Sequence, residues 1–342
     1  MTRKKLMWRA ALTLVLVLAV GGTWAGFNAF VLRAKYAANK LVAAPTDEER
    51  TRWADTLATH GTPGFDQLIG FVKSGEDLSR TAAAGALERH LNALPDGDAR
   101  AVTIGGSILD AYPTANDAGK RAILHLVPTI LNRTGGTHAG RCRDVVAEGL
   151  KMPDLDARLV AVRLAIHPDI RLRAEIVPLL TAKEPELRGA SLFAVATSSD
   201  NDQVIGDEEL FRWLHDVDAG VRKVCHDALV GRDRSDVEIS LGRRLTHLDP
   251  NERLKLLLDL RYDDVADPEP WLERLSRDPE PAVRAGSARV MVEVATVRRQ
   301  PCPGWVARVA DSDHHPTVRF IANYYRRLPI AASNGVIPAG GP

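Results

Sequence analysis

The chain has 342 residues and a formal net charge of +1; Ala, Leu and Val dominate its 45% apolar residues, and only 5% are aromatic. This composition favours packed helices over a β-sandwich, which is usually richer in Tyr, Phe and Ile. Residues 1–40 hold seven Lys or Arg and no acid, which leaves 38 basic and 44 acidic residues in the rest. An acidic body matches phosphate groups poorly, so the charge argues against nucleic acid as a partner.

The N-terminal region contains an uncharged, mostly apolar stretch at residues 10–32. As a helix it would be about 34 Å long, enough to cross a hydrocarbon core of about 30 Å. We therefore predict a transmembrane signal anchor at residues 10–32, preceded by a basic flank at residues 1–9. The alternative is a signal peptide cleaved after Thr23-Trp24-Ala25. Both interpretations export the remainder of the chain.

The flanking charges indicate an orientation for this segment. Four basic residues precede it and three follow it within residues 33–40. The excess favours a cytoplasmic N-terminus. We predict a single-pass membrane protein whose C-terminal domain lies on the periplasmic or extracellular side. Gly22 and Gly26 form a small-xxx-small pattern, which would allow homodimerisation of two membrane helices.

Residues 33–45 are predicted to link the anchor to the body, with a helix over Tyr36–Val42. Thr46 or Asp47 can accept hydrogen bonds from the first free N–H groups of a new helix. The body is therefore predicted to begin at residue 46.

The body consists of a repeated pattern centred on an arginine, clearest in Asp278-Pro279-Glu280-Pro281-Ala282-Val283-Arg284. The aligned arginines are Arg80, Arg121, Arg158, Arg188, Arg222, Arg253, Arg284 and Arg319. Four residues before them stand Glu76, Asp117, Asp154, Glu184, Asp218, Asp249, Glu280 and, in the last copy, His315. Three residues after them stand Ala83, Leu124, Ala161, Ser191, Cys225, Leu256, Ser287 and Ala322. The recurrence of all three positions indicates one structural unit.

These positions predict a helix that begins at a capped turn. The acid can accept hydrogen bonds from free N–H groups, and the arginine one turn later can reach that carboxylate or one from a neighbouring copy. The uncharged residue after it permits close approach of the next layer. Further helices precede the capped ones, at Asp207–His215, Asp236–Leu245, Pro268–Ser276 and Gly304–Ala310. We predict an all-α fold, an α-solenoid of about eight helical pairs.

The units resemble HEAT repeats, which are armadillo-like, and in particular the short bacterial type also found in HEAT-like phycobilisome-lyase proteins. The residues that carry the resemblance are the turn acids and pairs such as Val283-Arg284 and Val221-Arg222, with Ala-rich helices after them. It covers residues 70–328, and a degenerate unit near Asp47–His60 extends the predicted solenoid to residues 46–328. HEAT arrays are mostly scaffolds, so the resemblance implies protein binding and supplies no catalytic residue.

One segment contains several possible metal ligands. Asp311-Ser312-Asp313-His314-His315 combines four of them in five residues. It coincides with the turn of the last copy, where capping acids are expected anyway, so the turn is interpreted as structural. We predict no metal and no cofactor.

The three cysteines suggest no redox or metal chemistry. Cys142, Cys225 and Cys302 are separated by two or more predicted repeats, too far for disulfides. Cys225, His226 and His215 together would fit a thiol with a base. Cys225 occupies the small position after Arg222, however, which predicts a buried packing thiol.

Two further segments have unusual composition. Gly135–Gly140 is Gly-rich but follows a predicted helix at Lys120–Leu131, so we interpret it as a loop between repeats. Tyr324-Tyr325-Arg326-Arg327 is an aromatic and basic cluster that either docks a partner or belongs to a terminal helix with core Tyr and solvated Arg. Residues 329–342 are expected to form a disordered tail.

The combined prediction is a non-catalytic, membrane-anchored scaffold that binds another protein through the curved face of its repeats. An enzyme or chromophore-handling protein is the alternative that the lyase-type members imply. A secreted spacer or coat protein is the alternative if the N-terminal segment is cleaved.

Overall fold

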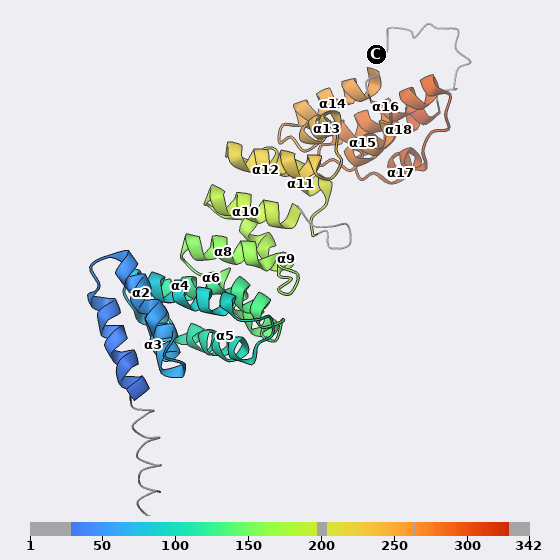
Figure 1. The fold of residues 1–342 in the computed structure, drawn as a ribbon. Helices are drawn as coiled ribbons and strands as arrows, with labels where there is room; N and C mark the ends of the chain where they lie inside the picture. Colours follow the sequence, from blue (N-terminus) through green and yellow to red (C-terminus); the bar gives the residue numbers. More distant parts are fainter. Residues whose placement is uncertain (1–28, 197–203, 263–264, 328–342) are drawn as a thin grey trace, which may run out of the picture. The chain divides into compact units, whose positions relative to one another are not determined.

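The computed structural model describes residues 29–196, 204–262 and 265–327, and within these ranges every regular element is a helix (Figure 1). The predicted all-α fold is confirmed for this part of the chain. No helix in the described ranges is both long and apolar enough to cross a bilayer. The predicted anchor at residues 10–32, with Gly22 and Gly26, lies almost entirely outside these ranges, as does the predicted tail at residues 329–342.

The chain forms two compact units, Met1–Val195 and Ala196–Pro342. The first unit contains α2 (Asp47–Ala58), α3 (Thr62–Ser74), α4 (Asp77–Ala93), α5 (Ala99–Ala111), η1 (Tyr112–Thr114), α6 (Asp117–Arg133), α7 (Ala139–Gly149), α8 (Leu155–Ala165), α9 (Arg173–Ile176), η2 (Val177–Thr181) and α10 (Pro185–Ala196). The second contains α11 (Asp207–Trp213), α12 (Ala219–Val230), α13 (Asp236–Leu245), α14 (Pro250–Tyr262), α15 (Glu269–Leu275), α16 (Pro281–Arg298), α17 (Gly304–Ser312) and α18 (Pro316–Arg326).

Helices pack in sequential pairs in both units. In the first unit α3 packs on α4, α5 on α6 and α7 on α8, while α4, α6 and α8 are successive neighbours. In the second unit α11 packs on α12, α13 on α14, α15 on α16 and α17 on α18, while α14, α16 and α18 are successive neighbours. In each of these pairs the even-numbered helix follows its odd-numbered partner in the chain.

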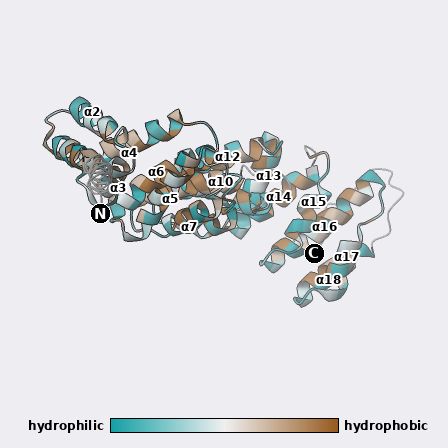
Figure 2. Cartoon of the chain, turned by 60° about the horizontal axis from the view of Figure 1, so that its bottom comes forward, coloured by the Kyte–Doolittle hydropathy of each residue, from teal (hydrophilic) through white to brown (hydrophobic). Residues whose placement is uncertain are grey.

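The residue three positions after each repeat arginine marks the buried face of its helix, from α4 to α18. All eight residues at that offset are 0% exposed, from Ala83 on α4 to Ala322 on α18. Apolar and polar residues alternate along the helices (Figure 2). Small or aliphatic side chains at this point let neighbouring helices approach closely, which explains a core with few aromatic residues.

The bounds predicted for four helices lie close to the observed ones. α13 spans the predicted residues because Ser235 and Glu238 form a capping box, with Ser235 Oγ accepting from Glu238 N at 3.3 Å and Glu238 accepting from Ser235 N at 2.9 Å. α11, α15 and α17 differ from their predicted bounds by two residues or fewer at each end. Such shifts are ordinary for helix ends without a strong cap.

The segment that precedes α2 is more than a linker. Residues 29–43 are helical, and Ala34, Ala37 and Leu41 on this helix are 1%, 1% and 0% exposed. Its Tyr36 ring packs edge-on against Trp53 of α2, with ring centroids 6.1 Å apart. The helix predicted over Tyr36–Val42 is therefore present, but it belongs to the packed body, which the sequence interpretation began only at residue 46.

Candidate functional site

The repeat arginines form a ladder, and each one lies near the N-terminus of an even-numbered helix. Arg222, Arg253 and Arg284 hold their own turns in the same way, because Nη1 donates to the carbonyl oxygens six and five residues upstream. For Arg284 these acceptors are Asp278 O at 2.7 Å and Pro279 O at 3.0 Å. This shared anchor fixes the direction in which each guanidinium presents its remaining donors.

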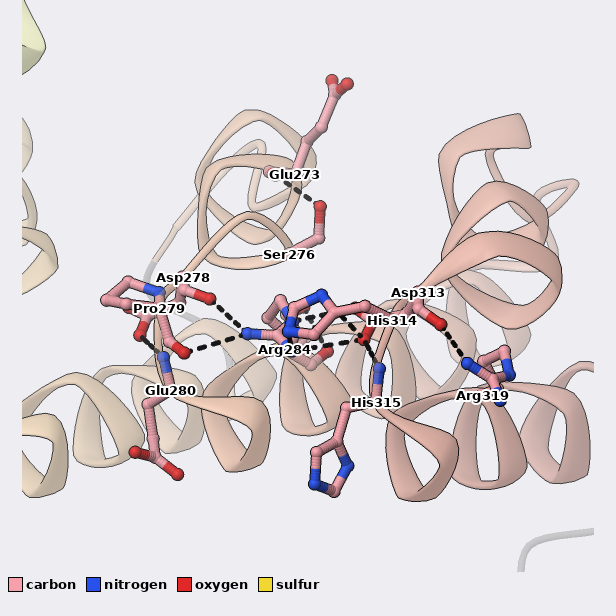
Figure 3. Close-up of polar contacts among 11 residues, drawn as sticks. Glu273, Ser276, Asp278, Pro279, Glu280, Arg284, Asp313, His314, His315 and Arg319 are labelled. Carbon is pink, nitrogen blue, oxygen red and sulfur yellow. Dashed lines mark hydrogen bonds and ion pairs between the residues drawn. The ribbon is translucent and has the colours of Figure 1, made fainter.

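For Arg253 and Arg284 the remaining donors bind an aspartate of the next copy, as Figure 3 shows for Arg284. Arg253 donates from Nε and Nη2 to Asp278 at 2.6 and 2.9 Å, and Arg284 does the same to Asp313 at 2.8 and 3.2 Å. The side chains of both pairs are at most 10% exposed. Two parallel charge-assisted bonds make each contact a strong and geometrically specific link between copies.

The carboxylates in these links are not the ones that the sequence pattern predicted. Asp278 and Asp313 lie six residues before an arginine, whereas the pattern placed the partner acid four residues before it. Glu280 at the predicted position only marks the helix start, and its side chain makes no cap bond. The apparent break at His315 disappears, because Asp313 supplies the last carboxylate.

The first unit does use acids at the predicted offset. Arg121 donates to Asp154 at 3.0 Å and Arg158 donates to Glu184 at 3.2 Å, each across to the next copy. These carboxylates are 28% and 37% exposed. The first copy differs again, since Arg80 binds Asp77 and the carbonyl of Gly75 within its own turn.

The predicted capping role holds for some of the acids. Asp154, Asp218 and Asp249 accept hydrogen bonds from the N–H groups of Asp156, Val221 and Asn251 at 3.2, 2.9 and 2.9 Å. The side chains of Glu76 and Glu280 make no cap bond. In the second copy Asn116, one residue earlier than predicted, caps α6 by accepting from Gly119 N at 2.8 Å.

The two carboxylates among the possible metal ligands, Asp311 and Asp313, make structural contacts. Asp313 binds Arg284 and also accepts from His315 N at 2.8 Å, whereas Asp311 pairs with Arg326 at 3.2 Å. Burial pushes the pKa of Asp313 upward, but the hydrogen bonds from Arg284 and His315 N–H outweigh it and lower that pKa overall. In the described part of the chain no three His, Cys, Asp or Glu side chains are grouped as metal ligands.

The cysteines are packing residues where they are buried. Cys225 is 0% exposed, and its thiol donates to the carbonyl of Leu210 at 2.9 Å. Burial raises its pKa to about 12, and that of Cys142 also to about 12. His215 instead lies with its Nε2 2.7 Å from the carbonyl oxygen of Arg243. A neutral thiol that is bonded to a carbonyl is not a nucleophile.

No protein-family model matches the chain, and no curated protein matches it. Function is therefore inferred from the chain's own residues.

An exposed row of side chains lies five residues after Arg253, Arg284 and Arg319, the last three repeat arginines. On the adjacent helices α14, α16 and α18 this row consists of Leu258, Arg289 and Tyr324, which are 54%, 46% and 55% exposed. The Arg289 guanidinium lies 5.2 Å from the centroid of the Tyr325 ring, and its Nε donates to Glu293 at 2.9 Å. We call these three residues the exposed row.

Only one end of this row, the cluster at Tyr324–Arg327, stands out in the sequence. The two tyrosines of that cluster have different surroundings. The Tyr325 ring packs against the Arg289 guanidinium, whereas Tyr324 is exposed. The missed signal was the five-residue offset from the last three repeat arginines. Leu, Arg and Tyr at that offset differ in chemistry, so no single residue type marked it.

Proposed function

We propose that the protein is a membrane-anchored, HEAT-like α-solenoid that acts as a non-catalytic scaffold and binds another protein through its even-numbered helices. The observation that carries the proposal is the exposed row. Arg and Tyr are enriched at protein interfaces, and aromatic or arginine side chains dominate their binding energy. A row at equivalent positions on three neighbouring helices offers an extended surface to a partner.

The HEAT-like part of the proposal is supported by the arginine ladder. Eight helices, the even-numbered ones from α4 to α18, share one arginine position and one fully buried position. Four of these arginines, Arg121, Arg158, Arg253 and Arg284, donate to a carboxylate of the next copy. Repetition of one packing unit, with contacts mainly between neighbours, is the defining property of a solenoid.

The anchor is supported by the apolar stretch at residues 10–32 and by the charges that flank it. If the proposal holds, the full chain stays in the membrane pellet during alkaline extraction. A protease added to the outer side of intact spheroplasts would then remove the C-terminal domain. Release of the protein at high pH, or complete protection from the protease, would contradict the anchor or its orientation.

The binding surface is tested with two matched substitutions. Leu258→Arg changes the exposed row, whereas Val237→Arg makes the same change at a residue of equal exposure, 55%, on the odd-numbered helix α13. We expect cross-linking and quantitative mass spectrometry of detergent-solubilised full chains to recover a partner set with wild type and Val237→Arg. Leu258→Arg should lose that set. Equal recovery by all three chains, or no reproducible partner, would contradict the proposed surface.

A further inference from the structure

The last arginine of the ladder is anchored like its predecessors but lacks a carboxylate. In Arg253 and Arg284, Nη1 holds the turn while Nε and Nη2 hold the aspartate of the next copy. Arg319 keeps the first contact, from Nη1 to the carbonyl of Asp313. Its Nε and Nη2 have no hydrogen-bond partner in the part of the chain that the structure describes. The donor pair that binds a carboxylate twice upstream is therefore open here (Figure 3).

Arg319 lines a surface groove between α17 and α18. The groove has a volume of about 810 Å³, and its walls include Pro316, Phe320, Tyr324 and Arg326. Phe320 is 71% exposed and Tyr324 is 55% exposed, although both are aromatic. An arginine with open donors thus lies beside apolar surface, the combination that binds a side-chain carboxylate flanked by apolar residues.

The charge of the groove also favours an acidic occupant. Three arginines line it, Arg319, Arg326 and Arg327, against the single acid Asp311. Arg326 neutralises Asp311 through an ion pair of 3.2 Å, so the groove keeps an excess of positive charge. A carboxylate would gain from this field in addition to the direct bonds to Arg319.

The two upstream links show which sequence motif supplies the carboxylate to a repeat arginine. Asp278–Val283 and Asp313–Val318 share the pattern Asp-x-x-Pro-x-Val. In each, the aspartate also accepts the N–H two residues later, at 2.8 Å, which holds the carboxylate in place before the arginine binds it. We propose that the groove binds an Asp-x-x-Pro turn of a partner protein, whose carboxylate bonds to Arg319 and whose apolar residues cover Phe320.

The chain's own segments are poorer occupants. Asp278 and Asp313 are already bound to Arg253 and Arg284. Residues 328–342 contain no Asp or Glu, so their side chains offer no carboxylate. The groove adds a second binding surface to the exposed row; the two share Tyr324, but neither depends on the other.

The probe is a fluorescein-labelled peptide with the sequence of residues 276–283, Ser-Arg-Asp-Pro-Glu-Pro-Ala-Val. It is titrated against the full chain in detergent micelles and followed by fluorescence anisotropy. We expect saturable binding, and binding weaker by about tenfold or more when the peptide carries Asp278→Asn or the protein carries Arg319→Lys, since lysine keeps the charge but loses the paired donors. Phe320→Ala should also weaken binding, and because this side chain is exposed it leaves the fold intact.

Two controls separate the groove from other effects. Arg308→Lys makes the same substitution on α17, at a side chain that is 69% exposed, and should bind as wild type does. Leu258→Arg should leave peptide binding unchanged even where it abolishes partner capture, so the two proposals can fail independently. Equal affinity of wild type and Arg319→Lys, or of the Asp and Asn peptides, overturns the groove proposal.

Other occupants give distinct results. A chain truncated after Arg327 could bind the peptide when the full chain does not. That result would show that residues 328–342 fill the groove, and it would overturn the proposal of a partner protein. Self-association of wild type in sedimentation experiments, lost with Arg319→Lys, would assign the groove to a second copy instead and would also overturn it. Absence of peptide binding by both chains overturns the proposal outright.

Discussion

The arginine ladder is built differently in the two units. In the first unit, Arg121 and Arg158 reach carboxylates four residues before the next arginine, and those carboxylates are 28% and 37% exposed. In the second unit, Arg253 and Arg284 reach aspartates six residues before the next arginine, and the side chains of both aspartates are 6% exposed. The same arginine position thus supports two kinds of link.

The difference follows from what stands six residues before each arginine. The four such positions in the first unit are Ser74, Ala115, Met152 and Ala182, and those in the second are Asp216, His247, Asp278 and Asp313. Each polar residue of the second set accepts the N–H two residues later, at 2.8 to 3.1 Å, from an oxygen or, for His247, from Nδ1. Where this residue is histidine the link is missing, and Arg222 has no carboxylate partner among the described residues.

An aspartate at this position does two things at once. It accepts a hydrogen bond that stabilises its own turn. That turn then holds the carboxylate in the position where the guanidinium of the previous copy can bind it. A buried ion pair is stabilising only when its geometry is good and its other hydrogen-bonding sites are satisfied, and both conditions are met here. The links of the first unit are more exposed, so solvent screens them.

The largest expected effect is the loss of a buried link. Asp278→Ala would leave Arg253, which is 8% exposed, without its carboxylate. Breaking one partner of a buried pair costs about 3–5 kcal/mol. Asp154→Ala in the first unit removes a cap and a solvent-exposed pair, together about 1–2 kcal/mol.

Urea unfolding of the full chain in detergent, followed by circular dichroism, measures both changes. Asp278→Ala should lower the midpoint of the transition assigned to the second unit by clearly more than Asp154→Ala lowers that of the first. Equal shifts would mean that burial of the carboxylate does not distinguish the two kinds of link.

A glycine pair extends the comparison to packing. In the second unit, a Cβ on Gly242 of α13 would lie 2.3 Å from Cδ1 of Phe211, whose ring is buried on α11. Gly242→Ala should therefore cost about 1–3 kcal/mol. Gly70 of α3 has open space around it, so Gly70→Ala should stabilise its helix by about 0.5–1 kcal/mol. Thermal melts that moved in the same direction for both variants would refute the close contact between α11 and α13.

Much of the fold was predictable, because one pattern carries it. The arginine positions locate the N-termini of the eight even-numbered helices from α4 to α18, and the residue three positions later locates their buried face. Both signals depend only on the helical period, which sequence spacing records directly.

The partners in the ladder were less predictable. Acids occur four residues before seven of the eight arginines, so the alignment selected that offset, whereas an acid six residues before occurs in three. Which carboxylate meets the guanidinium of the previous copy depends on the path of the turn backbone, and spacing along the sequence does not record that path. The exposed row was missed for a related reason, since its residues share a position but no chemical type.

Acid titration tests the buried link without removing it, and the expected effect is the smallest of the three. Hydrogen bonds from Arg284 and His315 N–H overcome the effect of burial and hold the pKa of Asp313 below its ordinary value. A carboxyl whose folded pKa is depressed contributes stability that is present above its unfolded pKa, roughly 4, and is lost as the pH falls through the folded value. The melting temperature of wild type should therefore fall below about pH 4 more steeply than that of Asp313→Asn, which has no such group to protonate.

Asp311→Asn is the control. The Asp311 carboxylate, which pairs with Arg326, is 60% exposed, so losing this ion pair should leave the pH dependence of the melting temperature as in wild type. Parallel melting curves for wild type and Asp313→Asn from pH 7 to 3 would mean that the link contributes nothing as an ion pair, and that the turn hydrogen bond from His315 N–H is what Asp313 supplies.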